Sequence, residues 1–192
     1  MLFRSIHNIP YQEAIGSLMY ALLGTCLDIT YTVQTVSHFS KNPGQAHWEV
    51  VKQIFGYLKG MKDFWLSYGA EQKDLKGYAD ADGSMVEDRH TIFGYTFLIH
   101  GGAVSWAAKQ QEIVSLPTTE REYVAVMHAS KEVLWLRSLI MQLFDIELEP
   151  TTLFSDNQSA ISLIKDHQYH PRTKHIDICY HFICWIIENG SI

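Results

Sequence analysis

The stretch Tyr78-Ala79-Asp80-Ala81-Asp82-Gly83 decides the fold, because it combines the alternation of a strand with two carboxylates beside a turn. Successive side chains of a strand point to opposite faces, so Tyr78, Asp80 and Asp82 should share one face and the two alanines the other. Residues 75–82 are therefore expected to form a strand. Periodicity alone leaves Asp80 and Asp82 equivalent as candidate ligands.

Two further acids lie on other expected elements. A long helix is expected after Pro117, extending to about Phe144, with an apolar face that includes Val126. Four residues before Val126 lies Glu122, which should therefore face the sheet, whereas Glu120 lies about 200° away and should point to solvent. Asp156 ends a strand expected at 151–156. Asp80, Glu122 and Asp156 thus predict a site for a hard divalent metal that assembles on folding.

Each acid also has an ordinary structural role open to it. Thr119-Glu120-Arg121-Glu122 has the pattern of a capping box, in which Glu122 would bind a backbone N–H at the start of the helix. Asp156 is a candidate cap for the next helix, and Asp80 is a candidate turn residue. Taken singly, these roles are favoured. The metal-site interpretation depends on the three acids meeting in space.

The remaining pattern indicates a mixed α/β chain. Residues 1–63 are expected to be helical, with helices after Pro10, from Asp28, and at 46–59. Further expected elements are strands at 64–68, 91–100, 103–108 and 113–116, and helices at 157–165 and 176–188. The second and third of these strands should form a hairpin across Gly101-Gly102.

Composition narrows the class of protein. The 192 residues suit one domain or a domain with an appendage, and 47% hydrophobic residues suffice for a core. A net charge of −6 disfavours indiscriminate coating of nucleic acid but is compatible with a metal-dependent nuclease. No window is apolar for long enough to span a membrane. Three cysteines favour a reducing compartment, so an intracellular location in cytoplasm or nucleus is expected.

Two other clusters of side chains suggest binding. The basic residues Arg172, Lys174 and His175 are candidates for contacts with substrate phosphates, although a solvated surface is the alternative. Cys179 and Cys184, with histidines nearby, raise the question of zinc, but their spacing is not that of a zinc knuckle. We expect loop and core roles for them. The sequence has no nucleophile elbow, phosphate-binding Gly-Lys-Ser/Thr loop or dinucleotide fingerprint.

Several segments, in the right order, resemble the ribonuclease H domain of copia-type LTR retrotransposon Pol polyproteins. They are Leu75-Lys76-Gly77-Tyr78-Ala79-Asp80-Ala81-Asp82, Val104-Ser105-Trp106, Thr118-Thr119-Glu120-Arg121-Glu122-Tyr123-Val124-Ala125, Lys131-Glu132-Val133-Leu134-Trp135-Leu136-Arg137, Asp156-Asn157-Gln158-Ser159-Ala160 and Arg172-Thr173-Lys174-His175-Ile176-Asp177-Ile178. The segment Pro10-Tyr11-Gln12-Glu13-Ala14 and the pair His47-Trp48 resemble the region that follows the reverse-transcriptase palm in the same polyproteins.

The resemblance implies a five-stranded mixed sheet with flanking helices and Mg²⁺- or Mn²⁺-dependent hydrolysis of the RNA strand of an RNA–DNA hybrid. It implies Asp80, Glu122 and Asp156 as catalytic metal ligands, and thereby selects Asp80 over Asp82. A fourth acid of the family lies beyond a further strand that this chain does not reach, so the domain is expected to be incomplete at its C-terminus.

The expected organisation has two parts: a helical region at 1–63, resembling the part after the palm, and a ribonuclease H-like domain at 64–192. The implied partners are an RNA–DNA hybrid and the rest of the Pol polyprotein, and no membrane. Two functions follow from these expectations. One is an RNA-cleaving enzyme, and the other is an inactive retrotransposon-derived remnant with at most weak nucleic-acid binding.

Overall fold

The computed structural model describes residues 9–69, 74–82, 90–114, 117–165 and 177–192. The chain forms two compact units, Met1–Leu66 and Ser67–Ile192. The assignment of the two units to parts of a polyprotein stays a prediction.

The first unit is helical, as its apolar periodicity predicts. Its elements are α1 (Tyr11–Gly24), a single 3-10 turn η1 (Leu27–Ile29), α2 (Thr30–Ser37) and α3 (Gln45–Gly60). Leu18, Val33 and Val51 from the three helices are fully buried in one apolar core. The Tyr11 hydroxyl donates a hydrogen bond of 2.8 Å to the carbonyl of Val36, which ties α1 to α2. The unit therefore has a core of its own.

The second unit is built on a mixed sheet with the strand order β3-β2-β1-β4. Its strands are β1 (Lys76–Asp82), β2 (His90–Ile99), β3 (Gly102–Val114) and β4 (Thr152–Phe154). The pairs β1–β2 and β2–β3 are antiparallel, whereas β1 and β4 run parallel. The expected mixed α/β class is confirmed. Four strands are present among the described residues, where the resemblance implies five.

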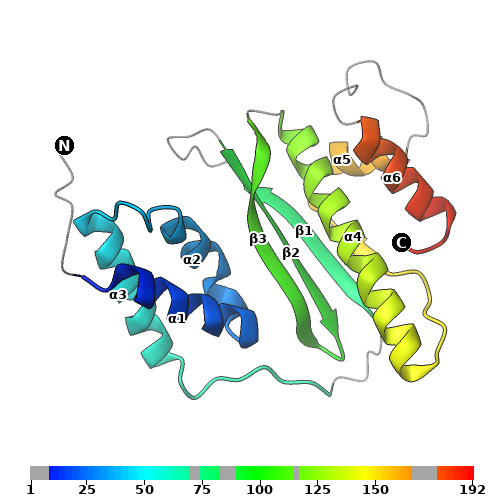
Figure 1. Cartoon of the computed structure of the whole chain (residues 1–192). Helices are drawn as coiled ribbons and strands as arrows, with labels where there is room; N and C mark the ends of the chain where they lie inside the picture. The colour runs from blue at the N-terminus through cyan, green and yellow to red at the C-terminus, as the bar shows by residue number, and fades with distance from the viewer. Residues whose placement is uncertain (1–8, 70–73, 83–89, 115–116, 166–176) are drawn as a thin grey trace. The chain divides into compact units, whose positions relative to one another are not determined.

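Helices cover one face of this sheet. The long helix α4 (Thr118–Phe144) packs across β1 and β2, while α5 (Gln158–Lys165) and α6 (Asp177–Glu188) pack against α4 (Figure 1). In β1, Gly77, Ala79 and Ala81 are buried, whereas Tyr78, Asp80 and Asp82 are exposed, which confirms the predicted alternation. The C-cap that follows α4 is Asp145, a residue in the left-handed conformation with φ 52°. No described helix is both long and apolar enough to cross a membrane.

Three local predictions are wrong in detail. Residues 64–68 form no strand: Phe64 and Trp65 are 72% and 80% exposed, so their aromatic pattern had no core to face. Residues 113 and 114 continue β3 and do not begin a separate strand. The hairpin turns at His100-Gly101, both with positive φ, and not at Gly101-Gly102. The turn lies one residue earlier than predicted, because Gly102 is already the first residue of β3. Gly102 lies against the ring of Tyr68.

Candidate metal centre

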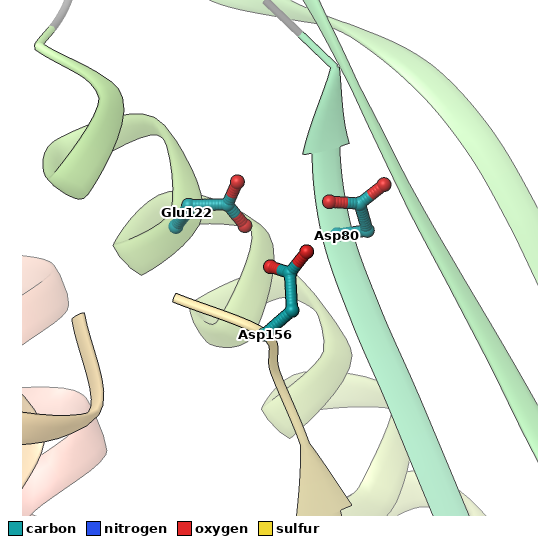
Figure 2. Close-up of side chains that lie close together, drawn as sticks. All are labelled: Asp80, Glu122 and Asp156. Carbon is teal, nitrogen blue, oxygen red and sulfur yellow. The ribbon is translucent and has the colours of Figure 1, made fainter. Parts of the chain in front are cut away.

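Three acidic side chains from three separate elements meet at one end of the parallel strand pair. Asp80 projects from β1, Glu122 from the first turns of α4, and Asp156 from the residues that follow β4 (Figure 2). One carboxylate oxygen of each lies within 4.8 Å of those of the other two. The convergence on which the metal-site interpretation depends is therefore present.

The register of the two parallel strands explains why Asp80 and Asp156 meet. The last matched pair is Tyr78 with Phe154, and each acid lies two residues beyond its member of that pair. The rings of Tyr78 and Phe154 stack with centroids 5.0 Å apart and planes 18° apart. A residue two positions along a strand points to the same face, so this stacked pair fixes the spacing of the two strands directly before the acids.

Glu122 reaches the same point from the helix. Its side chain is only 5% exposed, and its Oε2 is buried with no hydrogen-bond partner among the described residues. Burial, followed by the negative charges of Asp80 and Asp156, raises the pKa of Glu122 to about 7. A hydrogen bond from the backbone of Ala81 and the charge of Arg121 act in the opposite direction. A cation would satisfy the unpaired oxygen and relieve the repulsion.

The donor set fits a hard divalent cation. Carboxylate oxygens are the ligands that Mg²⁺ and Mn²⁺ prefer, and two of the three acids are exposed, so waters could complete the coordination. The orphaned Oε2 of Glu122 is an independent sign, because a buried polar atom without a partner is costly unless it has a ligand. These residues could hold a divalent cation.

The competing structural roles are occupied by other residues. The N-cap of α4 is Pro117, with no side-chain capping bond, so Glu122 is not part of a capping box. α5 is capped by Asn157, whose Oδ1 accepts a hydrogen bond of 2.9 Å from the backbone N–H of Ala160. An asparagine three residues before a helical N–H is a capping signal, so this role could have been assigned from the sequence. Asp82 lies at the end of β1, outside the acidic cluster.

One prediction about α4 is wrong. Glu120 was expected to point to solvent, yet it is 9% exposed and therefore nearly as buried as Glu122. A helical wheel gives the direction of a side chain about the axis, but it does not fix how much of that side chain is exposed. Glu120 nevertheless lies outside the cluster, so Glu122 is the helix acid that meets the two aspartates.

The remaining candidates of the sequence are not placed at this site. Arg172, Lys174 and His175 lie outside the described residues, and their contact with phosphates stays a prediction. Cys179 and Cys184 are partly buried free thiols. Within the described parts of the chain, neither belongs to a group of three or more metal-ligating side chains.

Comparison with known proteins reveals the ancestry of the chain. It is 43% identical over 186 residues, 96% of its length, to a retrovirus-related Pol polyprotein from transposon TNT 1-94 of Nicotiana tabacum. It is 34% identical over 185 residues to the retrovirus-related Pol polyprotein from transposon RE1 of Arabidopsis thaliana. The chain belongs to the family of retrovirus-related Pol polyproteins. It spans 14% of the tobacco polyprotein and 12% of the Arabidopsis one.

This Pol-family region also has a shorter relative. The secreted RxLR effector protein 161 of Plasmopara viticola is 38% identical over 131 residues, which are 67% of this chain and 92% of that protein. A scan against models of protein families found no match.

Two solved structures are similar to part of the Pol-family chain. They are LC11-RNase H1 in complex with an RNA/DNA hybrid, with a TM-score of 0.44 and 11% identity, and the N-terminal ribonuclease H domain of a Mycobacterium tuberculosis protein, with a TM-score of 0.43 and 11% identity. Each match covers 62% of this chain, and 79% and 78% of those chains respectively. Both similarities are too slight to bear on function.

Proposed function

We propose that this region of a copia-type Pol polyprotein is a divalent-metal-dependent endoribonuclease that cleaves the RNA strand of RNA–DNA hybrids. The observation that carries the proposal is the convergence of Asp80, Glu122 and Asp156 within 4.8 Å from three elements. Ancestry in a retrotransposon Pol polyprotein supplies the context in which such hybrids arise. The rest of the polyprotein is the proposed partner, and an intracellular location is proposed for the reaction.

In this proposal Asp80, Glu122 and Asp156 hold Mg²⁺ or Mn²⁺, and Arg172, Lys174 and His175 contact substrate phosphates. The bound metal would supply a water nucleophile at neutral pH and stabilise charge on the scissile phosphate. The protein provides fixed ligands, because Asp80 lies on β1, Asp156 lies two residues beyond the paired strand β4, and Glu122 lies on a packed helix. Glu122, with a pKa of about 7, must release its proton before it can act as a ligand.

A cleavage assay with two matched variants tests the proposal. The full chain is incubated with a labelled RNA–DNA hybrid and Mg²⁺, and compared with Asp80→Asn and Asp82→Asn. Both aspartates lie exposed on β1, but only Asp80 belongs to the acidic cluster. We expect Asp80→Asn to lower the rate about a hundredfold or more, since a metal contributes several kcal/mol to such a transition state. Asp82→Asn should retain most of the activity.

The alternative function predicts a different outcome. An inactive remnant with at most weak nucleic-acid binding would leave the hybrid intact in all three proteins. Cleavage at equal rates in the parent chain and Asp80→Asn would indicate a contaminating nuclease and would also refute the proposal.

A further inference from the structure

The position of Asp156 depends on β4, a short strand with one neighbour in the sheet. β4 has only three residues, and it pairs with β1 alone among the described strands. The residues that lead into it, 146–151, form no regular secondary structure; we call them the approach segment. They follow the end of α4 and return alongside that helix (Figure 1). The position of Asp156 therefore depends on what holds the approach segment.

Arg137 on α4 binds this segment at three points. Its guanidinium donates hydrogen bonds to the carbonyl of Leu148 at 2.8 Å, to the hydroxyl of Thr151 at 3.2 Å and to the carbonyl of Glu149. Thr151 is 1% exposed and immediately precedes β4. Its backbone N–H is held separately by the carbonyl of Ser191, at 3.0 Å.

The chemistry of these contacts suits a guanidinium and no other side chain. A planar fork with several N–H donors can bind three oxygen acceptors at once, whereas the single ammonium of lysine cannot reproduce that geometry. Hydrogen bonds from a charged donor are also stronger than neutral ones. Arg137 forms no ion pair among the described residues, so its charge serves the approach segment.

We propose that Arg137 is a positioning residue for the acidic site: it fixes the approach segment, and through it β4 and Asp156. Only the metal-binding part of the inference rests on the proposed function. Helical periodicity gave no indication of this role.

The test compares Arg137→Met and Arg137→Lys with Ser105→Ala in the full chain. Ser105 donates a hydrogen bond of 2.6 Å to Glu132, so it also ties α4 to the sheet, but through β3 and away from β4. Amide hydrogen exchange is measured without metal or nucleic acid, and the affinity for Mg²⁺ is measured by calorimetry.

We expect Arg137→Met to speed exchange at residues 152–154 about tenfold, with exchange in β2 unchanged, since hydrogen bonds to a charged group are lost locally. The Kd for Mg²⁺ should rise about tenfold or more, as is typical when residues that orient metal ligands are removed. Arg137→Lys should show smaller changes of both kinds. Ser105→Ala should leave exchange in β4 and the Kd unchanged.

The inference is overturned if exchange in β4 does not change, or if it rises equally in all strands as for a general loss of stability. If Arg137→Met does not fold, Thr151→Val removes one acceptor at nearly constant volume, and the same local pattern is required of it. A parent chain that binds no divalent cation refutes the proposed function, and the exchange pattern alone then decides whether Arg137 positions β4.

Discussion

The pKa of the Glu122 carboxyl is raised to about 7 by its surroundings. Its folded environment removes water and places two carboxylates nearby, so the protonated form is favoured. The helical period of α4 correctly predicted that Glu122 faces the sheet, because the direction of a side chain on a helix follows from its position. The same period failed for Glu120, whose burial depends on neighbours that no local pattern encodes.

The raised pKa of Glu122 predicts how stability depends on pH. The pKa is about 7 in the folded chain against a usual 4.5, so between these values the folded chain holds a proton that the unfolded chain has lost. Stability from the protonated carboxyl is present below pH 4.5 and is lost as pH rises through 7. Glu122→Gln, which stays neutral, should therefore gain ~1–3 kcal/mol relative to the parent between pH 4 and 8 without metal.

Urea unfolding at several pH values checks this expectation, with Glu147→Gln as a control at an exposed acid of the same unit. A difference between Glu122→Gln and the parent that is the same at pH 4 and pH 8 would contradict it.

At the scale of elements, the sheet requires close approach at one glycine of β1. A Cβ on Gly77 would lie 2.3 Å from the ring of Phe97 and 2.7 Å from Leu153. Phe97 is fully buried, so its ring cannot move aside into solvent. The side chains of Phe97 on β2 and Leu153 on β4 can therefore pack over β1 at this point only because position 77 has no side chain.

Gly77→Ala should cost ~1–3 kcal/mol of folding free energy, because overpacking forces buried side chains off their rotamers. Gly94→Ala on β2 is the matched control: its Cβ would meet only the carbonyl of Ala107, at 3.6 Å, and should change stability by less than ~0.5 kcal/mol. Thermal unfolding of the two variants measures both effects. Equal losses would show that the space around Gly77 is not limiting.

Elements with a clear period could be predicted from the sequence, including the short helix expected at 157–165 and present as α5, whereas the exposed segment 64–68 could not. α3, α4, β1 and the hairpin strands follow from apolar spacing that matches a helix or a strand. Residues 64–68 have the composition of a strand but pair with no strand among the described residues, because strand formation depends on pairing that lies elsewhere in the chain.

At the scale of the whole molecule, the two units have separate apolar cores. Leu18 is fully buried in the first, and Leu136, 4% exposed, lies in the second. Each Leu→Ala change should cost ~2–5 kcal/mol by leaving a cavity. The loss should stay within the unit that carries the change.

Amide exchange of the full chain tests this independence. Leu18→Ala should speed exchange in α1 to α3 and leave β2 unaffected, and Leu136→Ala should do the reverse. Faster exchange in both units from either substitution would show that they unfold as one.

The site itself could be predicted only as a set of candidates. Resemblance named Asp80, Glu122 and Asp156, but the distances among their oxygens depend on the parallel register of β1 with β4, which no local sequence pattern encodes. For the same reason, the ordinary capping and turn roles stayed open until the structure showed Asn157 and Pro117 in the capping positions.

The three acids lie on β1, on α4 and just after β4, so a cation bound as proposed could contact all of them only after these elements have come together. Ion binding would then be coupled to folding. Tyr78 lies two residues before Asp80 and stacks on Phe154, close enough to the cluster to act as an antenna. A luminescent lanthanide in place of the proposed Mg²⁺ or Mn²⁺, excited through this tyrosine, would begin to emit when β1, α4 and the residues after β4 first meet. The time at which this emission appears would report when the sheet assembles during refolding.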